Sequence, residues 1–287
     1  MITSVLRYFG LLEEPISRKY GWKPDKKDER DYQKVFEKLT HKENELYLVD
    51  LREKCPLVYD QGDLGSCTAN AIAGAYEYDM IKEKETVIFH PSRLFIYYNE
   101  REMEGNVDED AGAEIRDGIK SVNKQGIVPE EEWPYDISKF TYKPDENLYE
   151  EAKKHLAVKY ERVKQNLEHM KECLHRGYPF VFGFMVYESF ESQEVANTGN
   201  MPMPNRETER ILGGHAVMCV GYNDKTEKFI VRNSWGTEWG DEGYFYMPYE
   251  FMLSEDCSDF WTIERVVDET KEEEEGFYFR KLLDKFN

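Results

Sequence analysis

The feature that most constrains the fold is residues 61–71, where a glycine-broken loop runs into a helix of small residues. The loop reads Gln-Gly-Asp-Leu-Gly. Ser66 follows it as the predicted N-cap, because its hydroxyl can accept a free amide hydrogen of the first turn. One apolar face at helical spacing comes next, formed by Ala69, Ile72, Ala73, Tyr76 and Met80.

Cys67 lies in the first turn of this predicted helix. The positive end of the helix dipole stabilises a thiolate, which is the nucleophilic form of cysteine. A small buried thiol is the alternative, since free cysteines are often buried. The stretch alone favours a nucleophile without excluding a packed side chain.

The net charge bears on the partners of the chain. Its 287 residues carry a formal charge of −20, which argues against nucleic acid because phosphate binding needs a basic surface. The charge is uneven: residues 1–45 hold ten Lys/Arg and nine Asp/Glu, a net of +1, which leaves −21 for the rest. A near-neutral leader can therefore dock on an acidic body, although a solvated leader fits equally well.

Signals for export and membrane insertion are missing from the pattern. No apolar run reaches about 18 residues, and Arg7 interrupts the apolar N-terminus. The five cysteines are scattered and odd in number, and no Asn-x-Ser/Thr sequon occurs, which favours a reducing compartment. We expect a cytoplasmic or virion-associated protein with no membrane partner. Removal of a signal from a longer precursor is the alternative.

Helical patterns come first in the chain and strand patterns second, which predicts an α+β fold of two lobes. The expected parts are an N-terminal leader at 1–45, a mainly helical lobe at 46–155, a strand-rich lobe at 156–266 and an acidic C-terminal extension at 267–287. Besides the Cys67 helix, expected helices cover 91–98, 110–126 and 166–175. Expected strands cover 156–160, 178–187, 215–222, 228–232 and 243–247, and residues 191–210 form a long loop.

A cysteine nucleophile needs a base, and His215 is the best candidate among the six histidines. Two glycines precede it, which lets a substrate backbone approach, and an apolar strand follows as a rigid mount. A packed histidine at a strand edge is the alternative. His169, Cys173 and His175 lie on a charged helix without a fourth ligand at matching spacing, so we expect no metal site and no cofactor.

The group that orients the base is predicted to be Asn233, within Asn-Ser-Trp-Gly-Thr-Glu-Trp-Gly-Asp-Glu-Gly-Tyr at 233–244. An amide oxygen accepts an imidazole N–H without burying a charge, and Trp235 can cover that hydrogen bond. A glycine-rich hairpin with tryptophans in the core is the alternative. His215 and Asn233 follow Cys67 by 148 and 166 residues (215 − 67 and 233 − 67), near the roughly 130–150 residues typical of papain and cathepsins.

At this point the chain resembles the papain family of cysteine peptidases. The resemblance rests on Asp-Gln-Gly-x-x-Gly-Ser-Cys at 60–67, on Gly-His-Ala-Val at 214–217 and on the block at 233–244. It spans roughly 46–266 and implies a papain-like fold, with a helical left lobe, an antiparallel barrel-like right lobe and the active-site cleft between them. The stretch at 65–71 and Met-Pro-Tyr at 247–249 look most like the prokaryotic and large-DNA-virus branch.

The resemblance implies a role for each of four residues. Cys67 would be the thiolate nucleophile and His215 its imidazolium partner, a pairing that lowers the thiol pKa to about 3–4 in papain. Asn233 would hold the imidazole ring. Gln61 would stabilise the oxyanion together with the Cys67 N–H.

The resemblance also implies a set of substrate contacts. Small residues along the cleft would let a peptide add as a strand and would leave a pocket for an apolar or aromatic side chain, at the second residue before the cut. The implied contacts are Gly65, Gly112, Ala113, Gly183 and Gly214, with Trp235, and Trp239 on the leaving-group side.

Two positions depart from the family pattern. Leu64 stands where many members have a disulfide-bonded cysteine, and Thr68 stands where a tryptophan is usual. The missing disulfide is consistent with a reducing compartment.

The implied function is an endopeptidase that cleaves polypeptides through an acyl-enzyme. An exopeptidase or peptide-bond-forming relative is one alternative, although no His-bearing insertion lies between His90 and Ala111 to cap the cleft. The other alternative is a catalytically silent homologue that only binds, although all four predicted site residues are present. Inhibition by residues 1–45, as an intramolecular pro-segment, is a hypothesis motivated by their position and charge.

Overall fold

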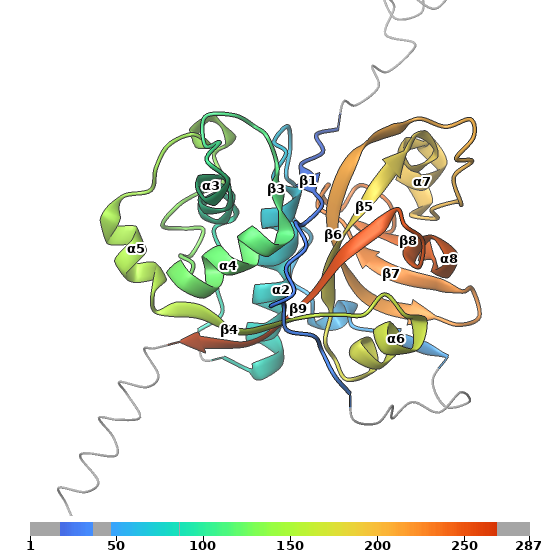
Figure 1. The fold of residues 1–287 in the computed structure, drawn as a ribbon, viewed down its shortest axis with the longest axis horizontal. Helices are drawn as coiled ribbons and strands as arrows, with labels where there is room; N and C mark the ends of the chain where they lie inside the picture. The colour runs from blue at the N-terminus through green and yellow to red at the C-terminus, as the bar shows by residue number, and fades with distance from the viewer. Residues whose placement is uncertain (1–17, 37–46, 86, 269–287) are drawn as a thin grey trace, which may run out of the picture.

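The computed structural model describes residues 18–36, 47–85 and 87–268, which form two lobes with the N-terminal segment between them (Figure 1). The expected structures at the apolar N-terminus and in the C-terminal extension beyond 268 lie outside the described residues. The helices are α2 (Cys67–Glu83), α3 (Arg93–Glu104), α4 (Ile115–Gln125), α5 (Glu146–Ala152), α6 (Leu167–His175), α7 (Gln193–Thr198) and α8 (Tyr249–Met252). The strands are β1 (Trp22–Lys23), β2 (Leu48–Asp50), β3 (Ala113–Glu114), β4 (His155–Arg162), β5 (Phe180–Tyr187), β6 (Ile211–Asn223), β7 (Lys228–Arg232), β8 (Tyr244–Pro248) and β9 (Cys257–Asp268).

Helix α2 is the central element of the molecule. It contacts α3 and α4 of the helical lobe and β6 and β9 of the sheet lobe (Figure 1). All its residues from Cys67 to Met80 are buried, where the sequence predicted one apolar face. A helix enclosed by two lobes has no solvent side. Its small residues make this enclosure possible: a Cβ added at Gly74 would lie 3.1 Å from Arg232 Nε of the sheet lobe.

The start of α2 differs from the sequence prediction. Ser66 is the N-cap residue of α2, as predicted, but with φ −95° and ψ 25° its side chain makes no capping hydrogen bond, so the predicted bond to a first-turn amide is wrong. Its hydroxyl lies 2.5 Å from the Tyr135 hydroxyl and accepts a hydrogen bond from Asn70 Nδ2 at 3.0 Å. Buried tertiary partners therefore replace the local amide that a capping serine would use.

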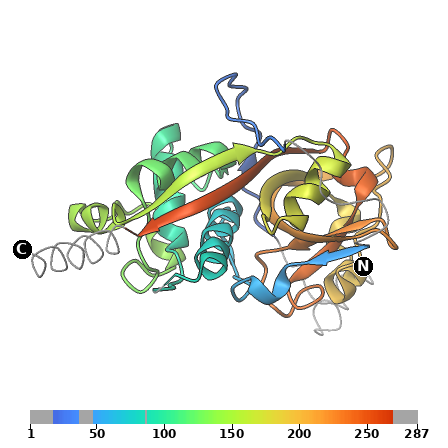
Figure 2. The ribbon, with the colours of Figure 1, turned by 90° about the horizontal axis from the view of Figure 1, so that it is seen from below.

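The sheet lobe is built on a seven-stranded sheet in the order β4-β9-β5-β6-β7-β8, with β2 paired to β6 off this path. All of these pairings are antiparallel. Strand β9 was not predicted, because charged residues interrupt its apolar ones and hide the alternation. It lies between β4 and β5, and β4 and β9 run together from the sheet lobe onto the helical lobe (Figure 2).

Smaller differences concern element boundaries. Helix α3 runs to Glu104 and ends at Gly105 in a left-handed conformation, beyond the predicted end at 98. The predicted helix at 110–126 starts only at Ile115, because Gly112 has φ +67° and the short strand β3 follows it. Helix α7 occupies part of the predicted loop at 191–210.

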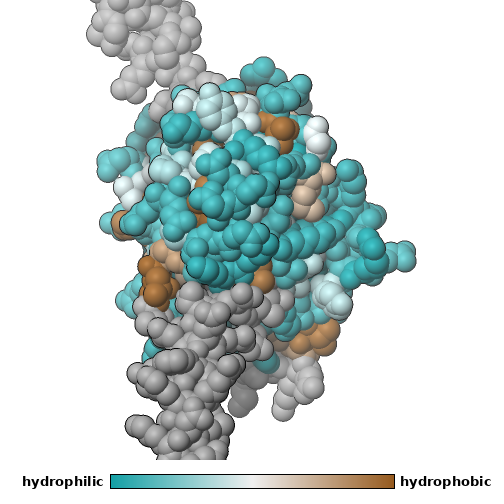
Figure 3. All heavy atoms as spheres, turned by 90° about the vertical axis from the view of Figure 1, so that its left-hand side faces the viewer, coloured by the Kyte–Doolittle hydropathy of each residue, from teal (hydrophilic) through white to brown (hydrophobic). Residues whose placement is uncertain are grey.

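An aromatic cluster fills the core of the sheet lobe. Phe182 on β5 is fully buried and stacks on Phe260 of β9, with 5.5 Å between ring centroids. Phe180 and Phe184 flank it at 6.1 and 6.2 Å. On the outside, the face seen from the helical side is mostly hydrophilic (Figure 3). Within the described residues, no helix has the length and apolar character needed to cross a bilayer.

We expect Phe182→Ala to lower the free energy of unfolding by about 3–5 kcal/mol, because the lost ring leaves a cavity between well-packed aromatic side chains. The midpoint of urea unfolding measures the loss. Tyr142→Ala is the control, since that ring is 60% exposed and its removal should cost little. Equal losses in the two variants would contradict this account of the core.

Candidate active site

Cys67 is the first residue of α2 and is fully buried at the boundary between the lobes. Backbone hydrogen bonds from Ala216 on β6 and from Gly21 in the N-terminal segment reach its sulfur. Ala216 directly follows His215 in the chain. The fold therefore brings the predicted nucleophile, from the helical lobe, next to the predicted base, from the sheet lobe.

His215 is held on the sheet side of this boundary. Its Nε2 lies 2.8 Å from Asn233 Oδ1, which also accepts a hydrogen bond from Ser234 N at 2.8 Å. Trp235, which the sequence predicted to cover this hydrogen bond, stacks on the imidazole with 4.9 Å between centroids and 25° between planes. The ring is fully buried, and its Nδ1 has no hydrogen-bond partner among the described residues. Donation from Nε2 to Asn233 thus leaves Nδ1 free to exchange a proton with a thiol.

Gln61 connects the two halves of the site. Its Oε1 accepts a hydrogen bond from Ser234 Oγ at 2.7 Å, and its N–H donates to Ser234 O at 2.9 Å. Its Nε2 donates to Leu64 O at 2.9 Å and to Lys19 O at 3.1 Å. The amide predicted to bind an oxyanion therefore already binds a peptide carbonyl of the N-terminal segment.

Residues 18–23 of that segment, the cleft segment, occupy the predicted substrate contacts. The indole of Trp22 lies over two of the predicted pocket glycines and is 5% exposed. A Cβ added at Gly183 would come within 1.9 Å of this indole, and one added at Gly214 within 2.8 Å. The glycines at these two positions make the pocket that Trp22 fills.

Gly21 occupies the other predicted contacts. Its carbonyl accepts a hydrogen bond from Ala113 N at 2.7 Å, and β1 pairs with β3 in parallel. A Cβ added at Gly112 would lie 1.9 Å from Gly21 O, and one added at Gly65 would lie 3.5 Å from Gly21 Cα. The predicted edge for an added strand thus carries a strand of the chain itself.

The two predicted tryptophans lie at the other end of the cleft segment. The Arg18 guanidinium carbon is 4.6 Å from the centroid of a Trp235 ring. Trp239 packs at a right angle against Trp235, with 4.9 Å between centroids, and is 5% exposed. Trp239 is therefore buried against Trp235, whereas the resemblance implied that it contacts the substrate directly.

Three kinds of residue were not predicted to belong to the site. Residues 20–25 are rich in turn formers, which favours an exposed loop, but the aromatic pair around Gly21 in a charged segment was a signal that this stretch is buried. Ser234 and Tyr135 were also not predicted; the Tyr135 hydroxyl donates to Gln61 O at 2.9 Å. The third is Thr68, whose place instead of a tryptophan the sequence did not explain: its hydroxyl donates to the fully buried Glu100 at 2.5 Å.

Burial changes the protonation of the site. It raises the pKa of the Cys67 thiol to about 11, although the backbone hydrogen bonds from Ala216 and Gly21 oppose the rise. Burial also lowers the pKa of His215 to about 4, against the effect of the hydrogen bond to Asn233 and with a further decrease from the Arg18 charge. With the cleft segment in place the pair is neutral, in contrast to the thiolate–imidazolium pair that the resemblance implied.

The described residues contain no group of three or more side chains placed to hold a metal ion. His169 Nε2 lies 3.0 Å from Lys34 O instead, and Cys173 is fully buried.

A thiol, an imidazole oriented by an amide and a second amide that binds a carbonyl oxygen are the groups that acyl transfer through a nucleophile needs. The family model for papain family cysteine proteases matches residues 47–258, which include all of these groups. The chain belongs to the papain family. It is a cysteine protease, a hydrolase of peptide bonds.

Two relatives show where in the family it lies. An uncharacterized peptidase C1-like protein of Acanthamoeba polyphaga mimivirus is 47% identical over 277 residues, covering 88% of this chain and 89% of the viral protein. The structure of xylellain, a cysteine protease from Xylella fastidiosa, superimposes with a TM-score of 0.78 at 43% identity, covering 88% of this chain and 98% of xylellain. These two relatives agree with the viral and prokaryotic branch that the motifs suggested.

More distant structures share the fold. The proform of cathepsin B from Trypanosoma congolense has a TM-score of 0.66 at 18% identity, covering 85% of each chain. The two-lobed papain-like architecture predicted from the motifs is thereby confirmed.

We expect the alkylation of Cys67 by iodoacetamide in the full chain to become faster up to strongly alkaline pH, with a midpoint near the raised pKa of about 11. Only the thiolate reacts, so a raised pKa moves the rise to higher pH. Mass spectrometry of the labelled peptide, with Cys67→Ser as the control for assignment, measures the rate. A midpoint at or below about 8.5, the ordinary cysteine value, would contradict the buried neutral thiol.

Proposed function

We propose that the chain is a cysteine endopeptidase whose own cleft segment holds it inactive. Cys67 is the nucleophile, His215 the acid and base, Asn233 the group that orients the imidazole, and Gln61 an oxyanion donor. The observation that carries the proposal is the 2.8 Å hydrogen bond between His215 and Asn233 beneath Trp235, next to a cysteine at a helix start.

The reaction follows from these groups. The Cys67 sulfur attacks the carbonyl carbon of the scissile peptide bond, while its proton passes to His215 Nδ1. The oxygen gains negative charge, and Gln61 Nε2 with the Cys67 N–H stabilises it. His215 then gives its proton to the leaving amine as the C–N bond breaks. Water, with His215 as base, hydrolyses the resulting thioester and releases the acid product.

The path of the cleft segment supports internal cleavage. The described chain enters at Arg18 against Trp235, passes Cys67 at Gly21 and continues beyond Lys23 to the clustered charges of residues 25–36 (Figure 1). A groove that holds continuous polypeptide on both sides of the nucleophile suits an endopeptidase. An exopeptidase needs one side to be closed around a chain terminus.

The chemistry of the cleft segment explains why it blocks the site without reacting. Gly21 brings a backbone N–H to the sulfur, where a substrate must bring a carbonyl carbon. Gln61 is engaged by Lys19 O, and Trp22 fills the pocket between Gly183 and Gly214. Substrate cannot bind until these contacts are released. The indole also indicates that the pocket accepts large aromatic or apolar side chains at the second residue before the cut.

We expect Trp22→Ala to raise the peptidase activity of the full chain at least about tenfold. Deleting a buried tryptophan costs about 3–5 kcal/mol, and each 1.4 kcal/mol is a factor of ten in the open population. Hydrolysis of an internally quenched peptide blocked at both ends measures the change. Tyr32→Ala is the control, because this side chain of the same segment is 74% exposed. Equal activities of the two variants would exclude the cleft segment as the inhibitor.

Adding Cys67→Ala to the Trp22→Ala protein should abolish hydrolysis of the same peptide, because Cys67 supplies the sulfur of the thioester. Adding Cys55→Ala, a partly buried cysteine, should leave the rate unchanged. Mass spectrometry after incubation with a thiol-directed epoxide peptide should place the adduct on Cys67. Surviving hydrolysis in the Cys67→Ala protein would move the nucleophile elsewhere.

A further inference from the structure

The described N-terminal segment makes two kinds of contact, and they change at Pro24. Residues 18–23, the cleft segment, lie in the active site mainly through backbone hydrogen bonds and the Trp22 indole. Their polar side chains add contacts of Arg18 with Trp235, of Tyr20 with Glu191 and of the partly exposed Lys23 with Glu104 at 2.8 Å. Residues 25–34, which we call the clamp segment, contact the body of the protein through buried charges. A substrate peptide can replace contacts of the first kind, whereas contacts of the second kind have no counterpart in a substrate.

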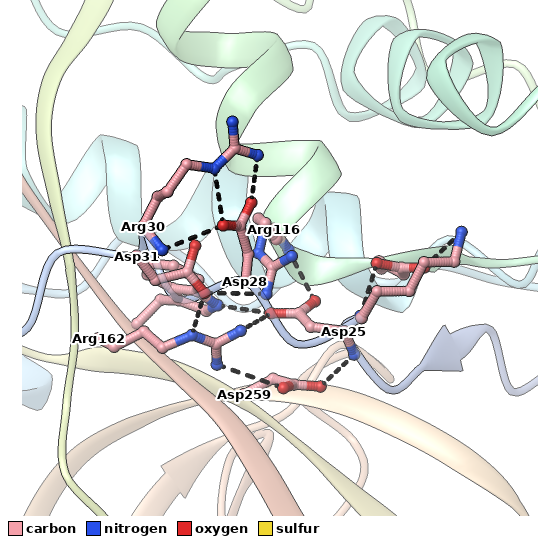
Figure 4. Close-up of polar contacts among 10 residues, drawn as sticks. Asp25, Asp28, Arg30, Asp31, Arg116, Arg162 and Asp259 are labelled. Carbon is pink, nitrogen blue, oxygen red and sulfur yellow. Dashed lines mark hydrogen bonds and ion pairs between the residues drawn. The ribbon is translucent and has the colours of Figure 1, made fainter.

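Asp25 is the first residue of the clamp segment to contact both lobes. Its side chain has no exposed surface. It accepts hydrogen bonds from Arg116 N at the start of α4, at 3.0 Å, and from Trp261 Nε1 on β9, at 2.9 Å. It also pairs with Arg162 on β4 at 2.8 Å. One carboxylate thus binds to the helical lobe and to two strands of the sheet lobe (Figure 4).

Asp31 repeats this arrangement. Its carboxylate pairs with Arg116 Nη2 at 2.9 Å and with Arg162 Nε at 2.7 Å, and its side chain is 8% exposed (Figure 4). Asp259 completes the group by accepting from Asp25 N at 2.7 Å and pairing with Arg162 at 3.3 Å. Arg116 and Arg162 belong to different lobes, so the clamp segment supplies the acids that join them.

The end of the clamp segment is fixed to the outer strand of the sheet. Lys34 N donates to Arg162 O at 2.9 Å, and Arg162 N donates to Tyr32 O at 2.8 Å. The Lys34 ammonium, 6% exposed, pairs with Glu161 at 3.4 Å and with Glu264. The clamp segment therefore pairs alongside the edge strand β4 through its backbone, and the Lys34 ammonium neutralises carboxylates of β4 and β9.

Loss of the clamp segment would be far more costly than loss of the cleft segment. It would remove Asp31 from Arg116 and both Asp25 and Asp31 from Arg162, which keeps Asp259. It would also remove Lys34 from Glu161 and Glu264, which keep Lys159. Breaking buried ion pairs from one side is strongly destabilising. Loss of the cleft segment uncovers an apolar pocket and backbone groups that water or substrate can satisfy. It breaks one ion pair, between the 38% exposed Lys23 and Glu104, and Glu104 keeps a hydrogen bond from Glu114 N at 2.8 Å.

We propose that the N-terminal segment divides at Pro24: the clamp segment is a permanent part of the catalytic body, and activation requires only that the cleft segment leave the active site. This inference rests on the proposed function. It replaces the idea of residues 1–45 as one removable leader with two parts of opposite function. The cleft segment inhibits, and the clamp segment holds the two lobes in register so that Cys67 meets His215.

Two versions of the full chain test the division. One carries a short recognition sequence for a sequence-specific serine protease between Lys23 and Pro24, and the other carries it within 37–46. Each protein is cut after folding, at neutral pH. This pH lies above the pKa of Asp25, which burial and the neighbouring Asp259 raise to about 6. Gel filtration with intact-mass analysis, thermal unfolding and hydrolysis of the blocked quenched peptide are then measured.

After the first cut we expect the piece that ends at residue 23 to separate, the body to keep its melting temperature and the peptidase activity to rise. After the second cut we expect the piece that ends before residue 47 to stay bound and the activity to stay low. Release of that piece, or retention of the shorter one, would overturn the division. If the body stays folded after it loses the cleft segment yet cleaves no peptide, the proposed peptidase activity is contradicted. The division of the N-terminal segment at Pro24 would still stand.

A matched pair of variants in the second protein isolates the ion pairs. Asp25→Asn keeps the size of the side chain but removes its charge, and should make the cut piece dissociate about a hundredfold faster. Asp28→Asn is the control, because Asp28 pairs with Arg30 of the same segment at 2.7 Å (Figure 4). Equal dissociation of the two variants would show that the charges do not hold the clamp segment.

Discussion

The packing of the start of α2 against β6 is the contact on which the rest of the site depends. It brings a cysteine from the helical lobe to a histidine from the sheet lobe, with a backbone hydrogen bond from Ala216 to the sulfur. The loop after β7 then fixes both sides, because Asn233 binds the imidazole and Ser234 binds Gln61. These contacts cross the lobe boundary, so the site exists only while the two lobes keep their register.

The N-terminal segment acts on that boundary in two ways. Its first part excludes water from the site, and burial then favours the neutral forms of Cys67 and His215 over the charged pair. Its second part places Asp25 and Asp31 between arginines of the two lobes. In the proposed function, one continuous stretch therefore both inhibits the reaction and holds together the two lobes that carry it out.

The motifs of the sequence were informative because their chemistry is local. Gln61, Cys67, His215 and Asn233 stand in short patterns whose glycines and neighbours restrict what they can do, and the family resemblance followed from them. Strand β9 escaped prediction because its charged residues obscure the strand pattern and its pairing partners are distant in the chain. The burial of Trp22 in the pocket was not predicted, because its partners, Gly183 and Gly214, lie more than a hundred residues away in the chain.

The sequence by itself determined the family, the two-lobed α+β class and which residues carry reactive groups, because each of these is written in short-range spacing and residue type. Only the tertiary structure decided that the Ser66 hydroxyl bonds to Tyr135 and Asn70 instead of to a first-turn amide of α2. It also decided that Thr68 donates to the buried Glu100 and that Trp239 packs against Trp235. The tertiary structure also decided the protonation states of Cys67 and His215. Burial and long-range charge pairs set these properties, and both depend on segments that meet only after the chain has folded.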